Sequence, residues 1–188
     1  MSGRTDGLMR DGHKGLASWF SSRLDAIATL HRWFPRIKKE NMSIDNMKTW
    51  HERARPNPTD KDFNVQLGCH LEEFVEMLDA LRGNDERSDN ALENLYYIAG
   101  QLARDLKSGE LHVSVATYER EAFLDSLADQ IVTATGVAHC AKMDITEACR
   151  RVNTSNWSKL VDGHPEFDKN GKIAKPPTYQ PPNLDGLY

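Results

Sequence analysis

Two groups of carboxylates, each at helical spacing and on separate stretches of the chain, are the residues most able to do chemistry. The first group is Glu72, Glu73 and Glu76, and the second is Asp125 and Asp129. Both groups stand among apolar residues, where a carboxylate is costly unless a positive partner compensates it. Carboxylate oxygens without converging histidine or cysteine suit Mg²⁺, with Mn²⁺ as a substitute. The pattern favours metal-assisted chemistry on a phosphate-bearing substrate.

The spacing places each group of acids on one side of a helix, because residues three or four apart are neighbours on a helix surface. Two antiparallel helices packed about 8–10 Å apart would then gather the five carboxylates around one or more divalent ions. A carboxylate not fully used as a ligand would be the general base. The alternative is that both runs are solvated faces of amphipathic helices, and spacing alone does not choose between the two interpretations.

The composition narrows the classes of protein. The 188 residues are 39% apolar and 28% charged, as in one globular domain with a core, and the net charge is −4. That charge provides no global basic field, so no nucleic-acid partner is expected. No apolar run approaches the roughly 20 residues that span a bilayer, and the start of the chain lacks a signal-peptide core. The cysteines, which form no CxxC pair, indicate reduced thiols and a cytoplasmic location; they are Cys69, Cys140 and Cys149.

Apolar periodicity predicts an all-α fold. We expect a flexible N-terminus over residues 1–14, a helical catalytic domain over 15–152, and an extended C-terminal arm over 153–188 that completes the site or the oligomer. The expected helices cover about 16–34, 44–53, 60–81, 90–106 and 117–142, with a short one opening at Asp144. Asp60 or Asp62 is expected to cap the third of these. Prolines crowd the arm, where residues 172–175 are the best candidate for a brief strand pairing.

The arm also carries the polar residues best suited to a nucleotide. Lysines suit phosphate groups, an amide suits a base edge or a phosphate, and an aromatic ring suits stacking on a base. The expected substrate-binding residues are Asn156, Lys159, Lys172, Lys175 and Tyr179. The alternative is a tail that its lysines keep solvated.

The order of these motifs resembles the all-α NTP pyrophosphohydrolase superfamily, which includes MazG, dimeric dUTPase and phosphoribosyl-ATP pyrophosphohydrolase. The acids Glu72-Glu73-x-x-Glu76 and the later Asp129 carry the resemblance, which spans about residues 47–184. The arm resembles the C-terminal signature of MazG-like proteins, including the phage MazZ type that acts on dGTP and GTP. Its matching runs are 155–159, 162–165 and 171–182.

The resemblance implies a MazG-like helical bundle in which Mg²⁺ assists cleavage of a nucleoside triphosphate to the monophosphate and pyrophosphate. It implies Glu73 and Asp129 as catalytic residues, and a homodimer or homotetramer that shares its sites between subunits. The expected location is the cytoplasm, that of the host if the protein is phage-encoded. The chain departs from the superfamily pattern at Ser126, where an acid is usual, so Asp125 must supply that carboxylate. The separation between the two acidic runs is also long, because the expected helix over 90–106 fills it.

Two other functions remain open. One is phosphoribosyl-ATP pyrophosphohydrolase activity in histidine biosynthesis, which the arm favours. The other is a non-catalytic helical interaction protein whose acids only solvate its surface.

Overall fold

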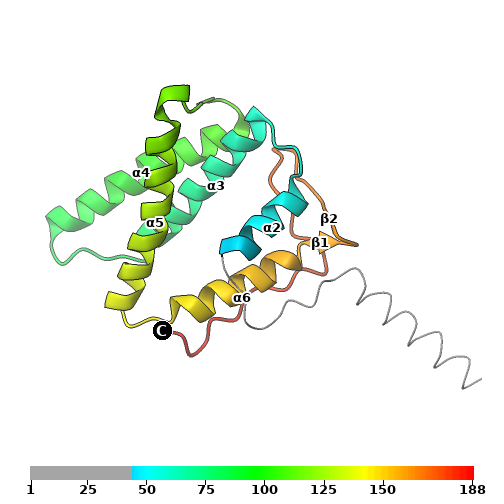
Figure 1. Cartoon of the computed structure of the whole chain (residues 1–188). Helices are drawn as coiled ribbons and strands as arrows, with labels where there is room; N and C mark the ends of the chain where they lie inside the picture. Colours follow the sequence, from blue (N-terminus) through cyan, green and yellow to red (C-terminus); the bar gives the residue numbers. More distant parts are fainter. Residues whose placement is uncertain (1–43) are drawn as a thin grey trace, which may run out of the picture. The chain divides into compact units, whose positions relative to one another are not determined.

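The computed structural model describes residues 44–188, and the expectations for a flexible 1–14 and a helix over about 16–34 lie outside this range. The described part is mostly helical, which confirms the all-α class at that level (Figure 1). Its α-helices are α2 (Ile44–Ala54), α3 (Asp60–Asp79), α4 (Glu86–Ser108), α5 (Arg120–Cys140) and α6 (Ile145–Trp157). The 3₁₀ turn η1 (Thr117–Glu119) leads into α5, and a small hairpin of β1 (Leu160–Val161) and β2 (His164–Pro165) follows α6.

The start of α3 is fixed by a capping box. Thr59 is the N-cap, and its side-chain oxygen accepts from the backbone N–H of Asp62 while the Asp62 carboxylate accepts from the N–H of Thr59. The expectation that Asp60 or Asp62 would be the cap is therefore wrong by position, although Asp62 is the reciprocal half of the box. At the next helix the cap is Asp85, so α4 begins before the expected residue 90. The predicted cap Asp144 does accept from the N–H of Glu147.

Helices α3 and α4 form an antiparallel pair that is tightly packed at Gly68. A Cβ at Gly68 would lie 2.7 Å from Cγ of Lys107 and 2.8 Å from the carbonyl oxygen of Ala103. Glycine thus lets the two backbones come closer than any larger residue would allow. Leu106 of α4, which is only 1% exposed, is buried at the same level.

Helix α5 lies beside α3 and runs in the same direction. The Phe63 and Phe123 rings meet edge to face with centroids 6.2 Å apart, and His70 Nε2 lies 2.6 Å from Gln130 Oε1. Both pairs advance by seven residues along both helices, so the two helices run parallel. The antiparallel pairing expected between these two acid-bearing helices is therefore wrong within one chain. The reason is that α4 inserts between them in sequence and reverses the chain once more.

Helix α6 and the C-terminal arm pack against α2. Trp50 is buried and donates its indole N–H to the carbonyl oxygen of Asn156 at 2.9 Å. The arm then returns along α6 in the opposite direction. Ser155 donates to the Gln180 carbonyl at 2.6 Å, and the Asp144 N–H donates to that of Leu187 at 2.9 Å.

The arm is shorter and more structured than the extended segment expected over 153–188. Residues 153–157 are the last turn of α6, and the chain turns back only after Ser158. Beyond the β1–β2 hairpin, Phe167 bridges to Ile173, so the brief pairing expected around residues 172–175 is confirmed. The helix continues because the first proline of the arm comes only at Pro165, which leaves residues 153–157 with every backbone donor.

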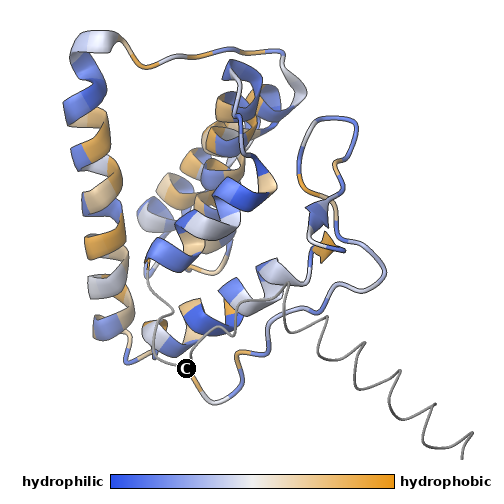
Figure 2. Cartoon of the chain, turned by 45° about the vertical axis from the view of Figure 1, so that its right-hand side comes forward, coloured by the Kyte–Doolittle hydropathy of each residue, from blue (hydrophilic) through white to orange (hydrophobic). Residues whose placement is uncertain are grey.

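Large apolar side chains remain exposed on the outer faces of three helices. Within α5 only Ala138 is buried, and apolar residues follow this helix along its length (Figure 2). The exposed apolar side chains include Met77 of α3, Leu81 just beyond it, Tyr97 and Ile98 of α4, and Leu124, Ile131, Val132 and Val137 of α5. Where exposed apolar side chains gather into a patch, the patch is typical of an interface with another chain. Among the helices of residues 44–188, none combines the length and the apolar character that crossing a membrane requires.

We predict that Gly68→Ala lowers the free energy of unfolding by about 1–3 kcal/mol, because the added methyl group overpacks the α3–α4 contact. The matched control is Gly136→Ala in α5, where a Cβ meets nothing within 4 Å. This control should raise stability by roughly 0.5–1 kcal/mol, since alanine is the better helix former. Urea denaturation of the two variants measures both effects, and equal shifts of the same sign would show that Gly68 has no packing role.

Candidate functional site

The site forms where α3, α4 and the arm meet, and Glu72 is at its centre. Its Oε1 accepts from Lys107 Nζ of α4 at 2.6 Å, and its Oε2 accepts from Lys172 Nζ of the arm at 2.5 Å. The Glu72 side chain is 29% exposed, compared with 16% for Lys107 and 44% for Lys172. One half-buried carboxylate therefore joins two segments that are far apart in the sequence.

The charges of this triad support one another. Burial alone would raise the pKa of Glu72, but hydrogen bonds to Lys107 and Lys172 outweigh it and hold the pKa below its ordinary value. Burial likewise opposes the charged form of Lys172, yet the Glu72 carboxylate raises the pKa of this lysine above its ordinary value. Glu72 and Lys172 are thus both ionised at neutral pH.

A second cluster joins two lysines of the arm to aromatic rings. Lys159 Nζ lies 6.0 Å from the centroid of the Trp50 ring and 5.8 Å from that of Tyr179, and Lys175 Nζ lies 5.2 Å from the Tyr179 centroid. These are cation–π distances. Burial lowers the pKa of Lys159, and the nearby Lys175 acts in the same direction, whereas Tyr179 and Glu73 oppose the shift.

Four of the five expected substrate-binding residues therefore come together. Lys159, Lys175 and Tyr179 form one cluster, and Lys172 lies close enough to act electrostatically on Lys159. The fifth, Asn156, lies in the last turn of α6 and contributes its backbone carbonyl to Trp50.

Glu73 and Glu76 lie on the exposed side of α3, between the arm and α5. Glu73 is three residues after His70, which contacts α5, and one residue after Glu72, which faces α4 and the arm. Its charge raises the pKa of Lys172 and opposes the lowering at Lys159. Within residues 44–188 neither Glu73 nor Glu76 makes a hydrogen bond or ion pair, so their oxygens face solvent.

Asp125 and Asp129 are exposed on α5 and turned away from α3. The face of α5 that contacts α3 carries Phe123 and Gln130. At 3.6 residues per turn, the two aspartates lie roughly 110–150° around the helix from that face. In the described part of the chain, no three His, Cys, Asp or Glu side chains group together as metal ligands. Within one chain, Glu73 and Glu76 on α3 are therefore held apart from Asp125 and Asp129 on α5, and the five expected carboxylates do not come together.

Two charged side chains at this junction were not predicted from the sequence. One is Lys107, which lies on the helix between the two acidic runs. The only sequence signal for its contact was Gly68, because a glycine four residues before Glu72, on the same face of α3, indicates that another helix packs closely there. Arg55 is the other. It hydrogen-bonds Asp62 and the carbonyl oxygen of Gly171, and its guanidinium lies 4.8 Å from the centroid of the Phe167 ring.

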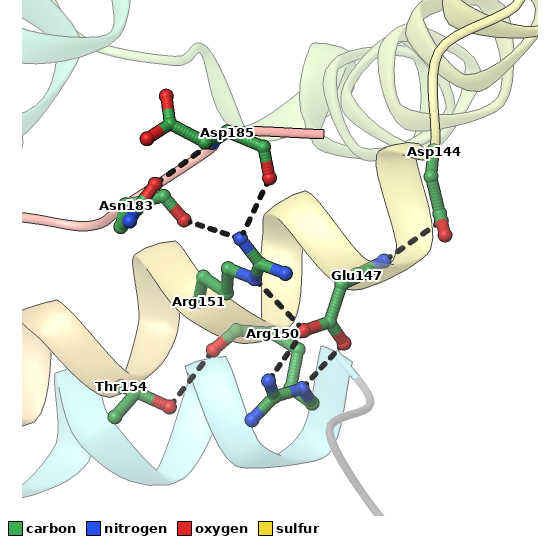
Figure 3. A network of polar contacts seen from close by, with 7 residues as sticks. All are labelled: Asp144, Glu147, Arg150, Arg151, Thr154, Asn183 and Asp185. Carbon is green, nitrogen blue, oxygen red and sulfur yellow. Dashed lines mark hydrogen bonds and ion pairs between the residues drawn. The ribbon is translucent and has the colours of Figure 1, made fainter. Parts of the chain in front are cut away.

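The far end of the arm is held by a separate network on α6 (Figure 3). Glu147 accepts from both Arg150 and Arg151, which lower its pKa to about 2. Arg151 also donates to the carbonyl oxygens of Asn183 and Asp185, at 2.8 and 3.3 Å. Charged groups thus hold the arm at Lys172 and again at Asn183 and Asp185, with Lys175 and Tyr179 between these points in the sequence.

We predict that Glu72 and Lys172 stabilise the folded protein from about pH 5 to about pH 10. Because the folded pKa of Glu72 is depressed, its contribution is present above the unfolded pKa and is lost as pH falls through the folded value. Because that of Lys172 is raised, its contribution is present below the unfolded pKa and is lost as pH rises through the folded value.

Thermal midpoints recorded across pH test this prediction. Glu72→Gln should flatten the loss of stability between about pH 5 and pH 3, and Lys172→Met should do the same. The part due to Glu147, whose pKa is about 2, should persist to lower pH in both variants. A Glu72→Gln curve parallel to that of the unaltered protein would show that the triad adds nothing to stability.

No protein-family model, curated protein or solved structure matches this chain.

Proposed function

We propose that the protein is a nucleoside triphosphate pyrophosphohydrolase that releases the monophosphate and pyrophosphate with the help of a divalent metal ion. The observation that carries the proposal is the meeting of acidic α3 with the lysine-bearing arm. Glu73 acts electrostatically on both Lys159 and Lys172, and the Trp50 and Tyr179 rings lie beside Lys159. Oxygen donors for a metal, cations for phosphates and rings for a base thus adjoin one another.

The charge distribution supports this proposal over a solvated tail. The chain has a net charge of −4, yet three lysines of the arm converge on one side of α3. Like charges converge only where their repulsion is compensated, and a triphosphate would supply that compensation. Burial already lowers the pKa of Lys159, so its charged form would gain most from an anionic ligand.

The metal would be Mg²⁺, with Mn²⁺ as a substitute. Glu73 and Glu76 supply one pair of carboxylates, and Asp125 with Asp129 supply the other. When bound, the ion would neutralise phosphate charge and lower the pKa of a bound water. The residues proposed as catalytic are Glu73 and Asp129, one from each pair.

We propose that a second copy of the chain brings the two pairs together in a homodimer or homotetramer. In one chain Asp125 and Asp129 face away from α3, on a helix whose outer face also exposes Leu124 and Val132 at 69% and 67%. An interface over this face would bury the apolar side chains and bring the aspartates toward a partner's α3.

The MazG-like resemblance agrees with these residues and suggests dGTP or GTP as the first substrates to try. Because nucleoside triphosphate pools are cytoplasmic, that location follows from the proposal, and no nucleic-acid or membrane partner is part of it.

The test is a panel of NTPs and dNTPs with Mg²⁺, together with phosphoribosyl-ATP, in which monophosphate and pyrophosphate are quantified. Turnover should require the metal. Glu73→Gln and Asp129→Asn should each lower kcat by roughly 10²–10⁴-fold, as expected for loss of a carboxylate that acts on the reacting groups. Each variant keeps its shape while losing one charge, so helical content by circular dichroism should be unchanged.

The panel also separates the alternatives. Turnover of phosphoribosyl-ATP alone would indicate the histidine-pathway enzyme. No metal-dependent pyrophosphate release from any substrate would indicate a non-catalytic interaction protein and would overturn the proposal.

Mixing the two inactive variants tests the shared site. If Glu73 of one subunit works with Asp129 of another, a mixed dimer of Glu73→Gln and Asp129→Asn chains contains one intact site and one doubly altered site. Unfolding and refolding the two variants together should therefore restore roughly a quarter of the activity per chain, because half of the dimers are mixed and each has one working site.

Light scattering at micromolar concentration is the companion measurement. It should give a mass well above the 21.3 kDa of one chain. A monomer that still turns over substrate, or an oligomer in which mixing restores nothing, would rule out the shared site.

A further inference from the structure

We infer that Glu72 is a positioning residue rather than a metal ligand, and that with Lys107 and Lys172 it clamps the arm onto α3. We call these three residues the Glu72 clamp. By holding the arm, the clamp places the cluster of Lys159, Lys175 and Tyr179 where Glu73 acts electrostatically on Lys159. The role toward substrate rests on the proposed function, whereas the clamp itself does not depend on it.

Each oxygen of Glu72 has its own lysine. Lys107, on α4, is largely covered and fixes the orientation of the carboxylate, while Lys172, on the arm, is more exposed. The three residues come from segments 35 and 100 positions apart, so the clamp closes long loops of chain. It forms only when α3, α4 and the arm are all in place.

Lys172 lies on a turn of the arm that several hydrogen bonds hold in place. Oδ1 of Asp168 accepts from the backbone N–H groups of Asn170 and Lys172, both at 2.9 Å, and Gly171 has a φ of 88° that favours glycine. Arg55 holds the same turn through the Gly171 carbonyl and the Phe167 ring. The turn is thus preorganised, which lowers the entropic cost of holding the long lysine side chain in one place.

The same contacts make Glu72 a poor metal ligand. Two ammonium groups within 2.6 Å of its oxygens would repel a divalent cation placed there. Glu73, one residue later, has no such direct pair among the described residues and faces solvent. Of the three metal ligands expected on α3, this inference makes Glu72 a positioning residue and keeps Glu73 and Glu76 as candidate ligands.

Hydrogen exchange of the arm tests the clamp without any substrate. The reporting amides are those of Asp168 and Ala174, which donate to the carbonyls of Lys172 and Glu166 at 2.8 Å. In Glu72→Gln they should exchange about fivefold faster or more, the scale expected for loss of a charged hydrogen bond. Glu73→Gln is the matched control and should leave these rates unchanged.

An internal reference lies at the other end of the arm. The Asp144 amide, which donates to the Leu187 carbonyl, depends on the Glu147 network and should exchange equally in every variant. Uniformly faster exchange, including at Asp144, would mean general destabilisation. In that case the Lys172→Met variant, altered at a more exposed position, decides whether the clamp exists. Unchanged exchange rates of the Asp168 and Ala174 amides in that variant would overturn the inference.

The lysine variants establish that Glu72 acts through Lys172. Lys172→Met should reproduce the effect of Glu72→Gln, and Lys172→Arg should restore protection. The double variant Glu72→Gln with Lys172→Met should exchange no faster than either single variant, because both remove the same contact. Additive effects would show that the two residues act separately.

Ligand titrations separate the two roles of an acid on α3. With Mn²⁺ alone, Glu73→Gln should bind several-fold more weakly, while Glu72→Gln should bind as the unaltered protein does. With an α,β-methylene analogue of dGTP, Glu72→Gln should bind several-fold more weakly, and for a hydrolysed substrate it should raise KM more than it lowers kcat. Equal loss of Mn²⁺ affinity in both variants would make Glu72 a ligand and overturn the inference.

These outcomes remain distinguishable from failure of the proposed function. If no triphosphate is hydrolysed or bound, the exchange rates of the arm still decide whether the clamp exists. If the clamp is absent, the substrate panel still decides whether the protein is a pyrophosphohydrolase.

Discussion

The close approach of α3 and α4 at Gly68 is the constraint on which the rest of the described structure depends. Without a side chain at Gly68, the α4 backbone comes near enough for Lys107 to lie over α3 and reach Glu72, one helical turn further on. Lys107 in turn leaves one oxygen of Glu72 for Lys172, so the arm attaches where the helices are closest. A larger residue at Gly68 would separate the helices and disturb the contact between Glu72 and Lys172, which are 100 positions apart in the sequence.

Local patterns predicted the helices well because helix formation is largely local. The apolar spacing located α2 to α5, and Asp144 marked the true start of α6. Boundaries were missed where a cap competed with neighbouring candidates, as Thr59 did with Asp60. The end of α6 was missed because the prolines of the arm suggested an earlier stop than the first of them, Pro165, actually imposes.

The site was harder to predict because its contacts are between distant segments. Residue types in the arm indicated Lys159, Lys175 and Tyr179, which the structure does place together. The spacing of Asp125 and Asp129 could not predict which way these side chains face. The same pattern fits a helix whose aspartates point toward α3 and one whose aspartates point away from it. Lys107 stood on a helix that looked like an insertion. A charge pattern gives the class of partner, but only the chain path tells which partner a residue meets.

The lysines of the arm differ in the contact that each would lose on binding an anion. Lys172 has a carboxylate partner, and leaving it would strand a half-buried charge on Glu72. Among residues 44–188, Lys159 and Lys175 contact aromatic rings instead of a carboxylate, contacts worth about 0.5–2 kcal/mol that a bound phosphate replaces at small cost. The same residue type therefore divides into one lysine that fastens the arm and two that remain available to a ligand. Exposure alone does not reveal this division, because Lys159 is more covered than Lys175; the kind of partner each lysine already has determines it.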